Sequence, residues 1–330
     1  MRKYLLTALI AAGFAQGVSA QQDPQFTQFF YNKLVMNPAY AGSKDMLCFT
    51  GLFRSQWVGL DGAPTSWLFS ADAPLPFKPG SQDFGVGFTA LGDYIGFETN
   101  HSFRLAANWK APNMIGPGYL RAGLDLGLTS KGINNATWIY PTPQNEPDID
   151  ALNNNSNMAM ELGVGAYWYN TNFYAGISAL HLAGMRYADV NITQARHMFI
   201  MGGYTWEEPF HPDWDFNPNV LIKTDFATAT ADFNVNAIWR NFVWGGLTYR
   251  LEDAIAINLG ADLGIWKPSL ESLQIGYSYD INLSRLSSYN SGSHEISVRY
   301  CLNLSKPQVI IPGYSVRYTD TSDRVAPEFK

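Results

Sequence analysis

Residues 120–131 read LRAGLDLGLTSK, a run in which apolar side chains alternate with polar or small ones. Side chains along a β-strand point to opposite faces with a period of two, so Leu124 and Leu126 share one face and Asp125 lies on the other. The same alternation recurs in residues 228–239, 254–265 and 273–282. The pattern predicts strands that separate an apolar face from a face of polar and small residues.

The length of these strands favours a membrane barrel over a soluble β-sandwich, which would also show alternation. The segments run to about ten residues or more, whereas soluble strands typically have about 5–6 and a tilted transmembrane strand needs about 9–11. Glycine and other small residues on the polar face fit a crowded lumen. We predict about fourteen antiparallel strands, an even number as in bacterial single-chain barrels: 45–55, 63–74, 83–92, 97–109, 118–130, 158–169, 172–180, 195–207, 216–226, 228–239, 241–251, 253–266, 270–281 and 294–304.

The N-terminus and the composition favour export to a membrane. Met1-Arg2-Lys3, an apolar stretch over 4–15 and Val18-Ser19-Ala20 form a signal peptide over 1–20. No later apolar run approaches the ~20 residues of a spanning helix, and a closed barrel is the other structure that pairs its backbone groups in lipid. Charged residues make up 15% of the chain, and the net charge of −6 argues against nucleic-acid binding. We therefore expect an outer-membrane location.

The barrel is expected over 45–304, with a segment at 21–44 before it and a tail at 305–330. The segment 21–44 either plugs the lumen as a short amphipathic helix or lies beneath the barrel. Asn37-Pro38 favours an extended turn and Gly42 relieves backbone strain before the first strand. The candidate plug or partner-binding residues are Gln25, Phe26, Phe29, Asn37, Pro38 and Gly42. With the N-terminus in the periplasm, the loops after odd-numbered strands face outward and should be the longer ones.

Charged residues recur on the face opposite the apolar one, so we expect them to point into the lumen. They carry both signs, which indicates a ladder of ion pairs more than a filter of one sign. These candidates are Arg54, Arg104, Arg121, Asp125, Asp232, Asp262, Asp280, Glu295 and Arg299.

The two cysteines of the chain lie in the first and last predicted strands. A closed barrel pairs those strands, which brings Cys48 and Cys301 to the periplasmic rim, both pointing inward. Exported proteins favour disulfides, although two unpaired small apolar residues are the alternative. Cα atoms more than about 7 Å apart would exclude the bridge.

The sequence offers little support for chemistry at a site. The five histidines are isolated along the chain, with no HxH or HExxH spacing, so no metal site or other cofactor is expected. Glu146, Asp148 and Asp150 lack the glycine and terminal glutamate of a calcium loop. His101 and Ser102 point to opposite faces and GxSxG is absent, so we do not expect an enzyme.

Several blocks of the chain resemble one family. The most specific is the N-terminal block, QDPQFTQ at 22–28 followed by NPAYAGS at 37–43. Weaker matches are RSQW at 54–57, GAPT at 62–65, GISALHL at 176–182, GYSYD at 276–280 and GSHEI at 292–296. From residue 22 to about 300 the chain resembles the PorP/SprF family of type IX secretion membrane proteins.

The resemblance implies an outer-membrane barrel of the Bacteroidota secretion and gliding-motility apparatus. Its expected partners are a secreted surface protein, such as the C-terminal domain of a large adhesin, together with type IX secretion components and outer-membrane lipid. The family lends no catalytic residues. A passive channel for small solutes is the alternative, and whether the lumen is open would separate the two.

Overall fold

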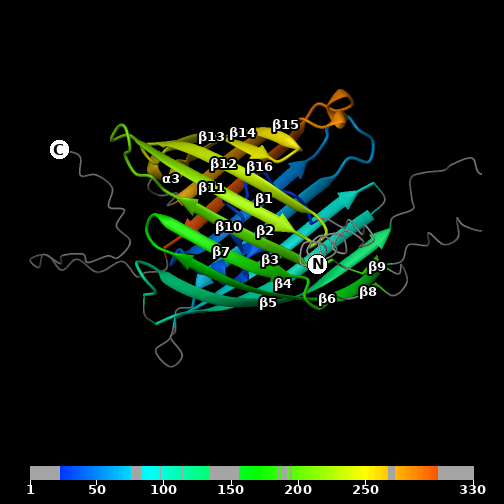
Figure 1. Cartoon of the computed structure of the whole chain (residues 1–330), viewed down its shortest axis with the longest axis horizontal. Coiled ribbons are helices and arrows are strands. Elements are labelled where there is room, and N and C mark those ends of the chain that lie inside the picture. The colour runs from blue at the N-terminus through cyan, green and yellow to red at the C-terminus, as the bar shows by residue number, and fades with distance from the viewer. Residues whose placement is uncertain are drawn as a thin grey trace, which may run out of the picture.

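Fourteen strands close into an antiparallel barrel in the computed structural model (Figure 1). The structure describes residues 23–75, 83–96, 98–112, 114–133, 156–184, 186–187, 192–193, 195–266 and 272–303. The predictions for the signal peptide, the acidic run at 146–150 and the tail at 305–330 lie outside these residues. Among the described residues, no helix is long and apolar enough to cross a membrane.

The barrel strands run in sequence order around the wall, apart from one short hairpin. Their bounds are β1 Leu47–Ser55, β2 Thr65–Pro74, β3 Asp83–Ile95, β4 Glu98–Lys110, β5 Tyr119–Ile133, β6 Ser156–Tyr169, β7 Phe173–Leu180, β10 His197–Tyr204, β11 Trp214–Thr224, β12 Ala229–Trp239, β13 Val243–Arg250, β14 Ala254–Asp262, β15 Ser272–Asn282 and β16 Ser293–Leu302. The prediction of about fourteen antiparallel strands is confirmed.

Two details differ from the predicted strands. The strand expected over 253–266 ends at Asp262, and the chain then turns through a short helix, α3 (Leu263–Trp266). The connection between β7 and β10 holds a small separate hairpin of β8 (Arg186–Tyr187) and β9 (Ile192–Thr193). Neither change alters the order of the barrel strands.

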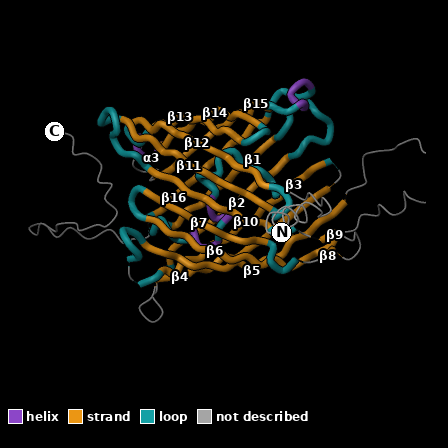
Figure 2. Tube along the Cα trace, viewed as in Figure 1, coloured by secondary structure: helices purple, strands orange, loops and turns teal. Residues whose placement is uncertain are grey.

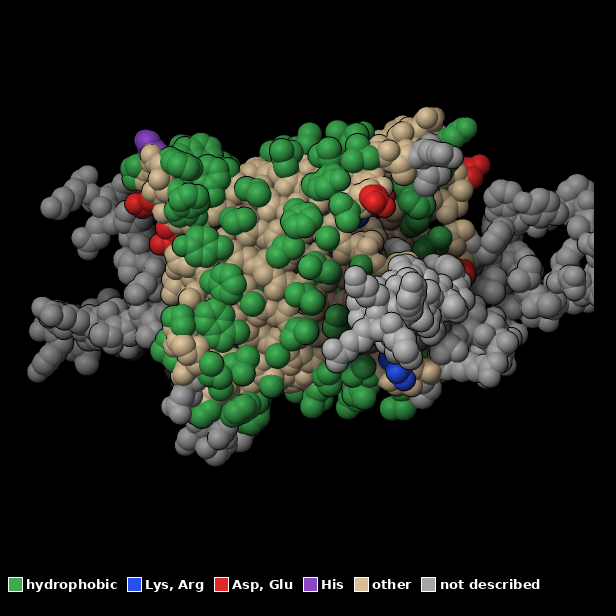
Figure 3. Space-filling view, viewed as in Figure 1, with side chains coloured by type: hydrophobic (Ala, Val, Ile, Leu, Met, Phe, Trp, Pro, Cys, Tyr) green, Lys and Arg blue, Asp and Glu red, His purple; other side chains and the backbone are tan. Residues whose placement is uncertain are grey.

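Each strand turns its apolar face outward and its polar face inward. In β5, Leu124 and Leu126 are each about half exposed, whereas Asp125 is buried. The same holds in β12, where Phe233 is exposed and Asn234 is buried. Hydrophobic side chains cover the middle of the visible wall, and the few visible charged ones lie toward its two ends (Figure 3). The apolar outer face suits contact with lipid, and the polar inner face suits a polar lumen.

The first and last strands close the barrel. β1 pairs with β16 along its whole length, from Leu47 opposite Leu302 to Ser55 opposite His294. Strands from the two ends of the chain thus lie side by side (Figure 1). We call the end of the barrel where Cys48 lies the disulfide end, and the end where Ser55 lies the long-loop end.

Residues 23–46 are here called the N-terminal segment, and its residues 23–42 lie inside the barrel, whereas Lys44 and Asp45 are exposed. Two short helices, α2 (Lys33–Met36) and η1 (Pro38–Tyr40), belong to this segment, in a molecule that is otherwise almost all strand and loop (Figure 2). The short amphipathic helix expected over 21–44 therefore appears as two separate single turns. Its apolar side chains are buried on all sides because the wall surrounds them.

Candidate functional site

The N-terminal segment is held in the lumen by a buried carboxylate. Glu295 of β16 is fully buried and accepts hydrogen bonds from the backbone N–H groups of Thr27 and Gln28, each at 2.8 Å. The Thr27 hydroxyl donates to the Asp280 carboxylate at 2.8 Å. The turn at 27–31 therefore takes its hydrogen-bond partners from the wall.

A cluster of ion pairs surrounds that turn. Arg54 lies 2.7 Å from Asp280 and 3.3 Å from Glu295, and it also donates to the Thr27 hydroxyl at 2.7 Å. On the other side Arg250 lies 3.5 Å from Asp280. These charges are almost fully buried, where an ion that lost its partner would be costly.

A second cluster holds the middle of the segment. Arg104 lies 3.3 Å from Asp125 and 3.6 Å from Glu161, and its guanidinium donates to the backbone carbonyl of Val35 at 2.7 Å. The guanidinium of Arg104, a residue of the barrel wall, thus bonds to a backbone carbonyl of the segment as well as to carboxylates of the wall. Arg104 therefore ties α2 to β4, β5 and β6.

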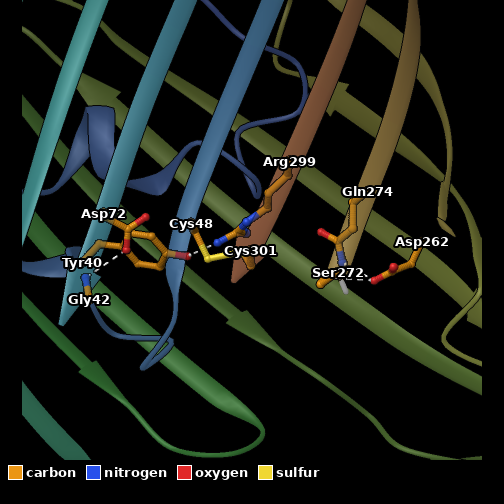
Figure 4. Close-up of a disulfide and its surroundings, with 9 residues drawn as sticks. All are labelled: Tyr40, Gly42, Cys48, Asp72, Asp262, Ser272, Gln274, Arg299 and Cys301. Carbon is orange, nitrogen blue, oxygen red and sulfur yellow. Dashed lines mark hydrogen bonds between the residues drawn. A yellow bond between two sulfur atoms is a disulfide. The ribbon is translucent and has the colours of Figure 1, made fainter. Parts of the chain in front are cut away.

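A third cluster lies near the disulfide end (Figure 4). Arg299 donates to the Tyr40 hydroxyl at 3.0 Å, and the backbone N–H of Gly42 donates to Asp72 at 2.9 Å. Arg121 donates to the Gly42 carbonyl at 3.0 Å. Gly42 has a positive φ of 66°, and an added Cβ would overlap the backbone of Ala73, so this position requires glycine.

The disulfide lies beside this cluster and covalently closes the barrel. Cys48 of β1 and Cys301 of β16 are joined, with their Cα atoms 4.0 Å apart. That distance is well inside the limit of about 7 Å for a bridge. Both cysteines are buried and face inward next to Arg299 and Tyr40 (Figure 4).

Asn37 shows how closely the wall fits the N-terminal segment. Its backbone is extended and its side-chain amide donates to the carbonyl of Ala166 at 3.0 Å, while its side-chain oxygen caps η1 at Ala39. A Cβ added at Gly165 would overlap that oxygen, and one added at Gly123 would overlap the backbone of η1. Glycines on the inward face therefore leave room for the segment.

All nine predicted lumen charges face inward, but they do not form one continuous ladder. Asp262 is only partly buried and accepts from Gln274 and Ser272, with no cation bonded to it among the described residues (Figure 4). Arg250 was missed by the sequence reasoning. Its alternation with Tyr249 in β13 could have placed it inward.

The predicted segment residues divide between the wall contacts and a cavity. Phe26 and Phe29 are buried in the apolar cluster and, with Gln25, line a cavity of about 270 Å³, whereas Pro38 begins η1. The cavity is lined by residues of the segment between 23 and 36 and by wall residues of the long-loop end, among them Glu98 and Lys131, which pair at 2.9 Å.

Lys33 of α2 carries a shifted pKa. Its ammonium lies 3.5 Å from the centre of the Tyr174 ring, a cation–π contact. Burial, together with repulsion by Arg299, lowers the pKa of Lys33 to about 7. The amine is therefore close to losing its charge near neutral pH.

The histidines correct one prediction. His181 and His197 are not isolated, because β7 and β10 are neighbours and their ring centroids lie 5.5 Å apart. Both are buried and both approach Asp23 at the edge of the cavity. Strand pairing, which spacing along the chain does not reveal, brings them together.

The sequence profile of the family described as type IX secretion system membrane protein PorP/SprF matches residues 18–300. The chain belongs to the PorP/SprF family. Its closed barrel with an apolar outer wall places it in the outer membrane, as the resemblance implied. No protein of established function matched it significantly in sequence.

Solved outer-membrane proteins resemble the chain at low identity. Omp33 of Acinetobacter baumannii shares 8% identity over 78% of this chain and 98% of its own, with a TM-score of 0.44. The toluene transporter TbuX of Ralstonia pickettii shares 10% identity over 82% and 92%, with a TM-score of 0.46. Outer membrane phospholipase A of Escherichia coli shares 12% identity over 85% and 99%, with a TM-score of 0.34.

Proposed function

We propose that this type IX secretion protein holds an exported surface protein, such as the C-terminal domain of a large adhesin, at the outer membrane, and that it has no catalytic role. The observation that carries the proposal is the N-terminal segment, which occupies the lumen through buried, charge-assisted hydrogen bonds. A lumen occupied by the segment favours binding of a partner protein over passage of solutes through the barrel.

The energy of those bonds argues against a passive channel. Three hydrogen bonds from Thr27 and Gln28 end on the carboxylates of Glu295 and Asp280. Hydrogen bonds to charged groups contribute about 1.5–3 kcal/mol each. Release of the segment would break all three bonds together, which disfavours an emptied lumen.

The cavity at the long-loop end supports a partner site that faces outward. It has a volume of about 270 Å³ and is lined by groups of both charges, including Glu98, Lys131 and Lys223. This is slightly smaller than a typical small-molecule pocket of about 300–1,000 Å³. A few side chains of a protein partner would fit, and most of its contact area would come from the surrounding loops.

Affinity purification of the tagged, detergent-solubilised full chain tests the proposal. We expect wild-type protein to recover a secreted surface protein or a secretion component. Asn100→Trp, which fills the cavity, should reduce that recovery. Thr171→Trp, in an exposed turn at the disulfide end, is the matched control and should not.

Two results would contradict the anchoring role. One is recovery of neither a secreted protein nor a secretion component with the wild type. The other is steady conductance of small ions by the purified wild-type barrel in a planar bilayer, which would favour the passive channel.

A further inference from the structure

Three potential metal ligands meet at the edge of the long-loop cavity. Asp23 comes from the N-terminal segment, His181 directly follows β7, and His197 begins β10. One ligand atom from each lies within 4.8 Å of the other two. Asp23, which precedes His181 by 158 positions, is thus brought to the histidines by docking of the segment against two paired strands.

His181 is already oriented on both sides. Its Nε2 lies 3.1 Å from each carboxylate oxygen of Asp23, and its Nδ1 lies 3.3 Å from Glu161. A carboxylate on the far nitrogen of a histidine is the usual arrangement behind a metal ligand, because it fixes the ring and raises its basicity. The same contacts also suit an imidazolium between two carboxylates, so His181 alone does not decide the matter.

His197 points to a ligand. Its side chain is 3% exposed, and neither ring nitrogen has a hydrogen-bond partner among the described residues. Nδ1 is directed at Asp23 but lies 3.8 Å from the nearer carboxylate oxygen, too far for a hydrogen bond. A buried imidazole whose two nitrogens have no partner is energetically unfavourable. An ion between His197 and Asp23 would remove that cost.

We infer that Asp23, His181 and His197 bind a divalent transition-metal ion of the Zn²⁺ class. Metal–ligand distances of about 2.0–2.2 Å place the ligand atoms of a tetrahedral zinc site roughly 3.3 Å apart. The observed separations of 3.1 and 3.8 Å to Asp23 lie close to that value. Two imidazoles favour zinc or a neighbouring transition metal over Ca²⁺ or Mg²⁺, which prefer oxygen ligands.

The site has the form of a three-ligand centre whose fourth position is directed to the cavity. All three ligands line that cavity, together with Glu161. The bound ion would link the start of the N-terminal segment to β7 and β10 at the long-loop end, as the disulfide links β1 to β16 at the other. The ion would thereby strengthen docking of the segment, whether or not the barrel anchors an exported protein.

Zinc titration of the full chain in detergent, after removal of metal with a chelator, tests the site. We expect one Zn²⁺ per chain by calorimetry and elemental analysis, with an increase in the apparent unfolding temperature. His197→Gln should weaken Zn²⁺ binding at least 100-fold, and Glu161→Gln about 10–100-fold. His101→Gln, which changes a histidine in the same cavity outside the cluster, should bind as the wild type does.

The inference is overturned if folded wild-type protein binds no Zn²⁺, or if His197→Gln binds it as tightly as the wild type. Retention of the compact electrophoretic form of the barrel shows that each variant is folded. Because the readout is metal binding, failure here leaves the anchoring proposal unaffected, and failure of the partner purification leaves the metal site unaffected.

Discussion

Replacing Glu295 with glutamine should release the N-terminal segment while leaving the barrel closed. The substitution preserves the shape of the side chain but turns one of its two acceptor oxygens into an N–H donor. In the native protein those oxygens accept from Thr27 and Gln28 at 2.8 Å and lie beside Arg54. One backbone N–H would then face another donor in a buried site.

The magnitude follows from those contacts. Loss of one hydrogen bond to a charged group costs about 1.5–3 kcal/mol, and a buried N–H without a partner costs about 1–3 kcal/mol. Arg54 keeps Asp280 as a partner at 2.7 Å, which limits any further loss. The total is roughly 3–5 kcal/mol, so the population of molecules with a released segment should rise at least 100-fold.

Trypsin cleavage after Lys33 measures that population. Lys33 lies in α2 inside the barrel, so a protease reaches it only when the segment leaves the lumen. When release and return are fast compared with cleavage, the rate follows the population of the released form. We expect Glu295→Gln to be cleaved at Lys33 at least 100 times faster than the wild type.

Asp262→Asn is the matched control. It makes the same kind of change at another inward carboxylate, which contacts Ser272 and Gln274 and no residue of the N-terminal segment by hydrogen bond. Its cleavage rate should equal that of the wild type. Equal rates for folded Glu295→Gln and wild type would refute the view that this carboxylate holds the segment.

Three further predictions concern the closure, the fit and the charge of the site. Replacing Cys48 and Cys301 with alanine removes a link across 253 positions and should lower the free energy of unfolding by about 2–5 kcal/mol. Reductant should lower the urea midpoint of the wild type but not that of the variant. Equal urea midpoints for the oxidised wild type and the variant would contradict this prediction. Gly165→Ala should cost about 1–3 kcal/mol by overlap with the N-terminal segment, whereas Gly51→Ala, with no atom near the added Cβ, should change the urea midpoint little, and a similar small change for both would show that the fit is loose. The folded pKa of Lys33 is about 7 and its unfolded value is 10.5, so the unfolded chain binds more protons between these pH values and the free energy of unfolding should rise from pH 7 towards pH 10. The slope should be smaller than about 1.4 kcal/mol per pH unit because the side chain is partly exposed. In Lys33→Met this contribution to the pH dependence of the free energy of unfolding should be absent.

Alternation and strand length alone predicted the barrel wall. Each strand must place successive side chains on opposite faces, so Leu126 could be assigned to lipid and Asp125 to the lumen without a structure. The same parity put Arg54, Glu295 and the other charges inside. The proximity of Cys48 and Cys301 followed from closure, because the first and last strands of a barrel must be neighbours, whereas the bridge between them is shown by the structure.

Only the tertiary structure decided what the inward residues contact. Parity says that Glu295 points inward, but its partners, the N–H groups of Thr27 and Gln28, come from a part of the chain with no periodic pattern. Whether that part filled the lumen or lay below it depended on the shape left free by glycines such as Gly165. The histidine cluster was missed for the same reason, since His181 and His197 meet only through strand pairing and through Asp23. Local sequence determines the face of each strand, whereas contacts across the lumen depend on how the whole barrel closes around the N-terminal segment.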